Sequence, residues 1–310
     1  MARYLVTGGA GFIGSNIAEA LVRRGEEVVV LDDLSTGYEK NIAYFRGALT
    51  FVRGDIRDEK AVRMAMTGVD YVLHQAALAS VPRSIEDPVL VTDVNLRGTL
   101  VVLEEARRAG VKRLVYAASS SAYGDSEALP KIETMVPRPL SPYAASKFAG
   151  EHYCSVYASV YGLPTVSLRY FNIFGPRQDP GSQYAAVIPI FASHIIAGTQ
   201  PTIFGDGEQS RDFTFIENVV DANIRASLCE EARGQVVNIA CGARYTLNEL
   251  FGMMRDALGS SIEPRYAPAR QGDVKHSHAD ISAARRLIGY EARVSFAEGL
   301  RKTLAWYRGA

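Results

Sequence analysis

Short apolar runs alternate with longer helical patterns between residue 3 and about residue 171, and this alternation constrains the fold more than any other feature. The runs are rich in Val, Ile and Leu, which is typical of strands buried on both faces of a sheet. Helices between successive strands indicate right-handed crossovers in a parallel sheet. The predicted strands are Tyr4 to Val6, Val28 to Leu31, Thr50 to Val52, Tyr71 to Leu73, Leu114 to Tyr116 and Thr165 to Arg169, and the predicted helices are Ile13 to Arg24, Asp58 to Met66, Val89 to Ala109 and Pro142 to Tyr161.

After residue 171 the pattern changes to loops and short elements. We therefore predict an α/β fold with a Rossmann-type doubly wound parallel sheet in residues 1–171 and a smaller C-terminal α/β substrate domain in residues 172–310. A helical pattern over Ile216 to Cys229 and a buried-strand pattern over Val236 to Ile239 predict that residues of about 214–242 return to the first sheet.

Charge and cysteine content exclude several classes of function. The 34 Lys and Arg balance the 34 Asp and Glu, so no global field attracts nucleic acid or a membrane surface. Three widely spaced cysteines do not form a secreted disulfide framework, and we find neither a signal peptide nor a membrane-spanning run, so we expect a cytoplasmic protein. The five histidines do not form a ligand set, and we predict no metal.

A glycine-rich turn follows the first predicted strand and opens the first helix. Gly8, Gly11 and Gly14 stand at the spacing that permits a tight turn, close approach of a pyrophosphate and close helix packing. The start of the helix would supply free N–H groups to the phosphates. The simpler alternative is a glycine turn without a ligand.

Acidic residues follow the second and third predicted strands. Asp32 is placed to accept hydrogen bonds from the adenosine ribose, and a carboxylate there repels a 2′-phosphate, which predicts NAD rather than NADP. Asp33 could share this role or cap the turn. Asp55 and Ile56 are placed to reach the adenine, although Asp55 could instead be a helix N-cap.

A Tyr and a Lys one helical turn apart are the candidate chemical groups. Ser141 and Pro142 begin a helix that carries Tyr143 and Lys147 on one face. We expect the Lys147 ammonium to lower the pKa of the Tyr143 phenol. The preceding strand ends in hydroxyl groups that could share a proton with the phenol, bind a sugar hydroxyl or only form a turn, namely those of Ser119, Ser120 and Ser121.

Several segments together carry a resemblance to a known family. They are TGGAGFIG, LDDLSTG, GDIRD, HQAA, the serine run, SPYAASK, RYFNIFGP and GDGEQSRDF, and they extend over nearly the whole chain. The chain resembles the extended short-chain dehydrogenases that modify nucleotide sugars. Among these it is most similar to the UDP-hexose 4-epimerases, particularly the branch that acts on UDP-N-acetylglucosamine.

The resemblance implies a role for each matching position. Ser119 and Tyr143 would be the proton-handling pair, and two helices near residues 94–109 and 143–161 would pack in a homodimer. The residues implied to hold NAD are Gly8, Gly11, Phe12, Ile13, Gly14, Asp32, Asp55, Ile56, Ala76, Ala77, Asn95, Tyr143 and Lys147, and those implied to hold the UDP are Asn172, Ala186, Val187, Arg211, Arg270 and Asp273.

The two arginines in the UDP group also fit this role by their chemistry. The guanidinium groups of Arg211 and Arg270 are forked cations suited to a diphosphate, although either could form a surface ion pair instead.

The reaction is predicted from what the serine run lacks. Relatives that dehydrate the sugar or decarboxylate a uronic acid carry an acid where this chain has Ser120 and Ser121. Without that carboxylate no group takes the proton from carbon 5 of the 4-keto sugar, and oxidation followed by return of hydride to the other face remains. We therefore expect 4-epimerisation with NAD that copurifies.

Two positions bear on the sugar. Ser277 stands where glucose-restricted epimerases hold a bulky Tyr, so a small residue would admit a 2-acetamido group, although Ser277 could be only a polar loop residue. We expect UDP-GlcNAc and UDP-GalNAc as substrates, with UDP-Glc and UDP-Gal also accepted. Arg83 could meet a uronic acid, so a UDP-glucuronate 4-epimerase stays open, as does a dehydratase or reductase of the same fold.

Overall fold

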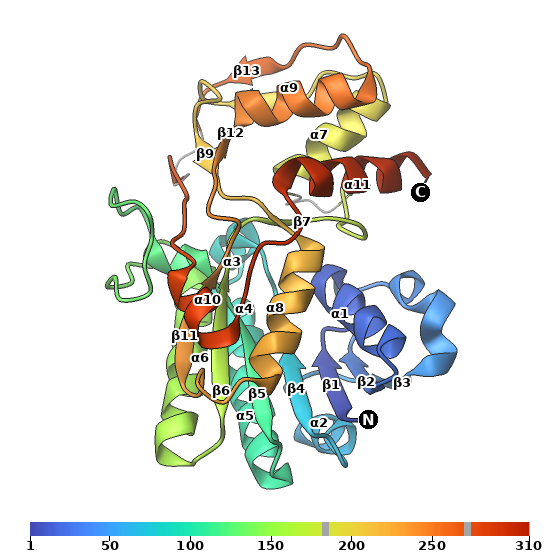
Figure 1. Cartoon of the computed structure of the whole chain (residues 1–310), viewed down its shortest axis with the longest axis vertical. Helices are drawn as coiled ribbons and strands as arrows, with labels where there is room; N and C mark the ends of the chain where they lie inside the picture. The colour runs from blue at the N-terminus through green and yellow to red at the C-terminus, as the bar shows by residue number, and fades with distance from the viewer. Residues whose placement is uncertain (182–185, 270–273, 310) are drawn as a thin grey trace.

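A computed structural model describes residues 1–181, 186–269 and 274–309. Within these residues a seven-stranded parallel sheet has the order β11-β6-β5-β4-β1-β2-β3, as Figure 1 shows. The strands are β1 (Arg3–Thr7), β2 (Glu27–Asp32), β3 (Thr50–Arg53), β4 (Tyr71–His74), β5 (Arg113–Ser119), β6 (Thr165–Tyr170) and β11 (Gln235–Ile239). The Rossmann-type sheet predicted from the apolar runs is confirmed.

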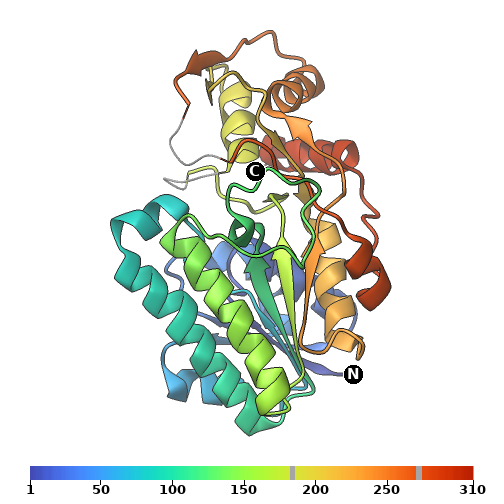
Figure 2. The same ribbon diagram turned by 90° about the vertical axis from the view of Figure 1, so that its left-hand side faces the viewer.

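Helices cover both faces of this sheet, because its strands are apolar on both sides. On one face α1 (Phe12–Arg23) packs against α8 (Ile216–Leu228). On the other face lie α2 (Glu59–Ala65), α5 (Gly98–Ala109) and α6 (Pro142–Val160), and Figure 2 shows α5 and α6 on the side of the sheet opposite α8. None of the described helices is both long and apolar enough to span a membrane.

The helix predicted over Val89 to Ala109 is interrupted. It consists of α4 (Pro88–Thr92), a π-helical turn over Asp93–Arg97, and α5. The turn carries Asn95, whose buried side chain binds the backbone of Leu78 through Asn95 Oδ1 at 2.8 Å. A wider turn of this kind is frequent at functional sites.

Short strands and helices from the second half of the chain lie at the carboxyl edge of the sheet, above it in Figure 1. The strand pairs are β7 (Ile173–Phe174) with β10 (Thr214–Phe215), β9 (Ser210–Arg211) with β12 (Tyr245–Thr246), and β8 (Thr202–Phe204) with β13 (Arg265–Ala267). The helices α7 (Val187–Ile196), α9 (Leu247–Leu258) and α11 (Phe296–Gly309) belong to this group. The α-helix α10 (Ser282–Ile288) packs beside β11, and α3 (Val81–Glu86) precedes α4 in the first half of the chain.

A buried aromatic cluster joins these elements to the segment that leaves β6. The Phe174 ring contacts Phe215 and Phe296, each at a centroid distance of 5.5 Å, and Phe296 stacks on Tyr245 at 4.2 Å. In sequence α8 and β11 stand between β10 and β12, yet β11 pairs with β6 in the central sheet. The division of the chain at residue 171 stays a prediction.

Candidate functional site

The glycine turn between β1 and α1 has no room for side chains. Gly8 has φ +65°, and a Cβ added there would lie 2.8 Å from the backbone of Ala76. A Cβ on Gly14 would lie 2.1 Å from the Gly8 carbonyl oxygen. Gly11 precedes Phe12 and Ile13 and gives the start of α1 no side-chain cap, so no capping side chain occupies its first N–H groups.

Asp32 ends β2 beside this turn. Its buried carboxylate accepts hydrogen bonds from Ala10 N at 2.9 Å and Leu34 N at 2.8 Å. Burial raises the pKa of Asp32 above its ordinary value, and the two backbone bonds oppose the rise. The exposed Asp33 carboxylate accepts from both the backbone and the hydroxyl of Ser35, which is the turn-capping arrangement.

Asp55 follows β3 but does not cap the next helix. Its carboxylate pairs with Arg57 at 2.6 Å, and this hydrogen-bonded guanidinium holds the pKa of Asp55 below its ordinary value. Asp58 is the N-cap of α2, because its side chain accepts from Lys60 N at 2.9 Å. The N-cap interpretation of Asp55 is therefore wrong. Ile56 is buried next to Asp55.

His74 is a buried residue whose ring connects two hydrogen-bonded threonines, and the sequence analysis did not assign it to the site. Ala76 N–H donates to Thr7 Oγ1 at 3.3 Å, and Thr7 Oγ1 lies 2.6 Å from His74 Nδ1. On the other side His74 Nε2 lies 3.0 Å from Thr99 Oγ1, which donates to the Asn95 carbonyl. These directions assign the proton to Nε2. Burial lowers the pKa of His74 to about 3, so its ring is neutral.

Asn95 extends this network to the helix with the candidate chemical groups. Its Nδ2 donates to the carbonyl of Leu78 at 3.3 Å and to Ser146 Oγ at 3.1 Å. Ser146 donates in turn to the Tyr143 carbonyl at 2.8 Å. The loop after β4, which contains Ala76 and Ala77, is thereby tied to α6.

Tyr143 lies in the first turn of α6, which Ser141 caps by accepting from Ala144 N at 3.1 Å. Its phenol is hydrogen-bonded by Ser119, the last residue of β5, and the Ser121 hydroxyl donates to Ser119 Oγ at 2.8 Å. Three hydroxyl groups thus form a chain that ends at the Tyr143 phenol. Ser120 stands between the two serines in a 3₁₀ turn.

Lys147 is placed differently from our expectation. Its Nζ lies 4.5 Å from the centroid of the Tyr116 ring, and burial lowers the pKa of Lys147 to about 7. The pKa of Tyr143 is raised by burial and opposed by the Ser119 hydrogen bond, with no contribution from Lys147. The expected lowering of the Tyr143 pKa is therefore wrong for this structure, because desolvation outweighs the Ser119 hydrogen bond.

The residues assigned to UDP come from several of the short elements. Asn172, which follows β6, has φ +37°, and Arg211 ends β9. Ala186 is the N-cap of α7 and Val187 its first residue. Ser277 donates its backbone N–H to the Ser210 carbonyl at 2.9 Å, and Arg83 lies in α3. Arg270 and Asp273 lie outside the described residues.

The sheet order explains why the dinucleotide residues meet. Neighbouring strands β1 and β4 lie where the connections turn to opposite sides of the sheet, which is where ligands bind in such folds. Gly8 and Asp32 therefore share one edge with the loop after β4. The described residues contain no group of three or more His, Cys, Asp or Glu side chains suited to a metal ion.

Comparison with known proteins points to one family. The model of the NAD dependent epimerase/dehydratase family matches residues 4–240. The chain is 40% identical over 310 residues to a UDP-glucose 4-epimerase of Mycolicibacterium smegmatis, covering 99% of this chain and 98% of the relative.

Two solved structures are similar in both fold and sequence. A UDP-N-acetylglucosamine 4-epimerase from Methanobrevibacter ruminantium, in complex with UDP-N-acetylmuramic acid, has a TM-score of 0.95 and 40% identity, covering 99% and 98% of the two chains. A Thermus thermophilus UDP-glucose 4-epimerase in complex with NAD has a TM-score of 0.90 and 42% identity, covering 99% of each chain.

Proposed function

Because the chain belongs to the NAD dependent epimerase/dehydratase family, we propose that it is an NAD-dependent UDP-hexose 4-epimerase. The observation that carries this proposal is the half-buried Tyr143 phenol, hydrogen-bonded by Ser119 at the same sheet edge as the glycine turn. A phenol held in this way can take a proton from a sugar hydroxyl and give it back.

The residues at the glycine turn fit NAD. The turn excludes side chains, the start of α1 is uncapped, and the Asp32 carboxylate suits ribose hydroxyls but repels a 2′-phosphate. When bound, NAD supplies the hydride acceptor and donor for carbon 4 of the sugar. We assign its binding to Gly8, Gly11, Phe12, Ile13, Gly14, Asp32, Asp33, Asp55, Ile56, Ala76, Ala77, Asn95, Tyr143 and Lys147.

Tyr143 Oη takes the proton of the sugar 4-hydroxyl as carbon 4 is oxidised, and returns it to the opposite epimer. Ser119 and Ser121 steady the phenolate by donating along the chain of hydroxyl groups. Lys147 has a pKa of about 7, so at neutral pH it is present in both protonation states and can support the phenolate as an ammonium.

Epimerisation is favoured over dehydration by the side chains beside Ser119. Ser120 and Ser121 are hydroxyl residues in the turn that follows β5, and neither is a base for a carbon-bound proton. The 4-keto sugar therefore keeps its carbon 5 proton and its substituents, and only the configuration at carbon 4 changes.

The sugar specificity follows from Ser277. Its small side chain lies in the segment that pairs with Ser210, and it leaves volume for a 2-acetamido group. We assign UDP-GlcNAc and UDP-GalNAc as substrates, with UDP-Glc and UDP-Gal also accepted. The similarity to a UDP-N-acetylglucosamine 4-epimerase supports this assignment. Changing Ser277→Tyr should lower turnover of the N-acetylated sugars selectively.

A second candidate substrate is UDP-glucuronate. The half-buried Arg83 guanidinium has no hydrogen-bond or ion-pair partner among the described residues, so it can meet a carboxylate. Assays of UDP-glucuronate and of the neutral UDP sugars, with the wild-type protein and with Arg83→Gln, separate this activity from that on neutral sugars.

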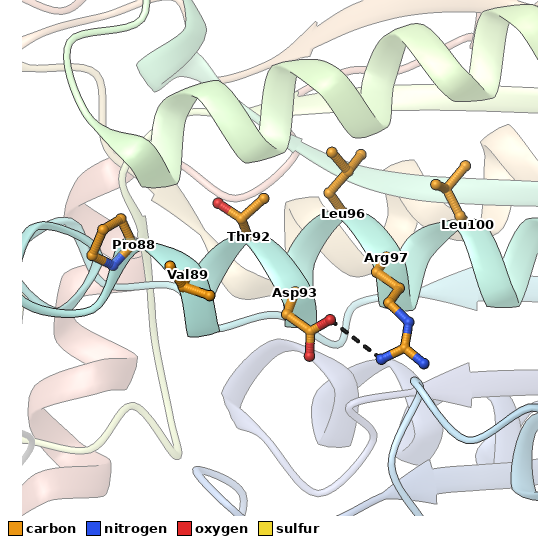
Figure 3. A pocket seen from close by; sticks show the side chains of 7 residues that line it. All are labelled: Pro88, Val89, Thr92, Asp93, Leu96, Arg97 and Leu100. Carbon is orange, nitrogen blue, oxygen red and sulfur yellow. Dashed lines mark hydrogen bonds and ion pairs between the residues drawn. The ribbon is translucent and has the colours of Figure 1, made fainter.

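We also assign a homodimer. α4, the π-helical turn and α5 form a hollowed surface next to α6, lined by Pro88, Val89, Thr92, Asp93, Leu96, Arg97 and Leu100, as Figure 3 shows. Val89 is 78% exposed, and on α6 Val156 is 42% and Val160 67% exposed. Exposed aliphatic side chains gathered on adjacent helices are typical of an interface, and a second copy would cover them in a four-helix arrangement.

The decisive experiment uses the purified protein without added NAD. Each UDP sugar is incubated with it, and the products are separated and identified. We expect interconversion of 4-epimers without net NADH. Tyr143→Phe should abolish conversion, whereas Tyr161→Phe, which removes an exposed hydroxyl beyond the end of α6, should not. Conversion by the Tyr143 variant, or water loss from the sugar, contradicts the proposal.

A further inference from the structure

The buried Asp212 carboxylate joins three segments of the chain. It lies directly after β9 and is 0% exposed. Its Oδ1 accepts from Cys241 N at 2.9 Å, and its Oδ2 accepts from Gly242 N at 3.1 Å and Ala279 N at 3.3 Å. Two of the donors leave β11 and the third precedes α10, so one side chain fixes both segments to the end of β9.

The backbone at Asp212 and Ser210 is also hydrogen-bonded to residues assigned to the nucleotide sugar. The Asp212 carbonyl accepts from Asn172 Nδ2 at 3.0 Å, and Arg211 is its chain neighbour. On the other side of Arg211, the Ser210 backbone N–H donates to the Lys275 carbonyl at 3.0 Å, and the Ser210 carbonyl accepts from Ser277 N at 2.9 Å. The described UDP and sugar residues on both sides of β9 therefore depend on how Asp212 holds the backbone.

We propose that Asp212 is a positioning residue for the nucleotide sugar: as an anion it binds three backbone N–H groups, and this fixes the backbone of residues 210–212, which places Arg211, Asn172 and the Ser277 segment around the diphosphate. This inference rests on the proposed function and adds a residue that touches neither sugar nor dinucleotide. The three backbone donors compensate the burial of the Asp212 carboxylate, and the neighbouring His278 also favours its charged form.

The arrangement predicts that substrate binding weakens at acid pH. Burial raises the pKa of Asp212 to about 6, although the backbone bonds oppose the rise. As the pH falls through this value the carboxylate gains a proton, accepts N–H bonds less well and loosens the two segments. The titratable groups that interact with it are Cys241, Tyr245, His278 and Tyr290. Its chain neighbour Arg211 interacts with His276, as do Arg244 and Lys275.

The test measures kcat and KM between about pH 5 and pH 8, spanning the Asp212 titration, for a UDP sugar that the wild-type protein converts, with its bound NAD. The phosphates of a UDP sugar are diesters and do not titrate in this range. Asp212→Asn keeps the shape but loses the charge and one acceptor, so its KM at neutral pH should rise about tenfold. Its kcat and NAD content should stay near wild type. The wild-type KM should rise below pH 6, and that of Asp212→Asn should not.

Three variants are matched controls. Glu133→Gln alters another carboxylate whose pKa burial raises, one that accepts from Asn238 N at 2.7 Å. His278→Gln removes the imidazole that interacts with Asp212, and His276→Gln removes the imidazole that bonds the Ser210 hydroxyl. All three should keep the rise in KM below pH 6. The inference is overturned if Asp212→Asn has wild-type KM and pH dependence, or if the pH dependence disappears in a control instead.

Two outcomes separate this inference from the proposed function. If the wild-type protein converts no UDP sugar, the proposed function fails, and calorimetric binding of UDP-glucose to wild type and Asp212→Asn still decides the role of Asp212. If circular dichroism shows that Asp212→Asn is unfolded, the role of Asp212 is decided by the pH dependence of KM in the wild-type protein and the two His variants. A variant that lacks either imidazole and no longer shows the rise in KM below pH 6 contradicts the proposal.

Discussion

The Lys147 ammonium lies 4.5 Å from the centroid of the Tyr116 ring, in a fully buried position. The contact is a cation–π interaction, and the Tyr116 hydroxyl donates to the Lys147 carbonyl at 3.3 Å. The Tyr116 ring thus contacts the Lys147 side chain, and the Tyr116 hydroxyl bonds the backbone of α6. Burial nevertheless leaves the pKa of Lys147 at about 7, well below its ordinary value.

The first prediction is that Lys147→Met inactivates the protein but stabilises it at neutral pH. The folded-state pKa of Lys147 is depressed, so between about pH 7 and the ordinary pKa of Lys the unfolded chain binds one proton more. Wild-type stability should therefore rise by about 1.4 kcal/mol per pH unit over this window from this group alone. Chemical denaturation of both proteins across the window measures it, and equal slopes contradict the prediction.

The second prediction concerns the neutral ring of His74. Its folded pKa of about 3 lies below the ordinary value, so its contribution to stability is lost as the pH falls from the ordinary His value toward 3. His74→Asn should lose about 1–3 kcal/mol at neutral pH, because Thr7 and Thr99 lose buried partners. Bound NAD should also fall, since Thr7 anchors Ala76 N.

His194 provides the matched control for this prediction. Its Nδ1 also pairs with a threonine, Thr199 Oγ1 at 2.8 Å, but the contact is exposed. His194→Gln should leave both the unfolding free energy and the NAD content near wild type. A loss of similar size in both variants would show that burial of the His74 network is not the cause.

The sequence predicted those features that leave a local pattern. Strands buried on both faces leave continuous apolar runs, and the Tyr143 and Ser119 motifs stand at the ends of such elements. Each of the strands β7, β9, β10 and β12 has two residues, too few for a periodic pattern in the sequence to reveal it.

Features that depend on pairing across the sheet could not be predicted in this way. Thr7 and His74 are 67 positions apart and become neighbours only through the register of β1 with β4. The prediction for the Tyr143 pKa was wrong for a related reason, because sequence spacing places Lys147 one turn away but does not show that desolvation raises the pKa of the phenol.

The third prediction compares two glycines. A Cβ on Gly14 would lie 2.1 Å from the Gly8 carbonyl oxygen, and neither backbone segment can move without opening the turn. Gly14→Ala should therefore release NAD, which absorbance of the purified protein measures. A Cβ on Gly252, inside α9, would have nothing within 4 Å, so Gly252→Ala should retain NAD and gain about 0.5–1 kcal/mol of unfolding free energy.

The last prediction tests the homodimer through Val89, which is 78% exposed near the start of α4. A carboxylate is compatible with the first turn of a helix, so Val89→Asp should leave the fold intact while placing a desolvated charge in the interface. Leu228→Asp is the control, because Leu228 is 54% exposed at the end of α8 on the other face of the sheet. Light scattering should give a dimer for wild type and Leu228→Asp and a monomer for Val89→Asp. A wild-type monomer, or a dimer that survives Val89→Asp, removes this surface as the interface.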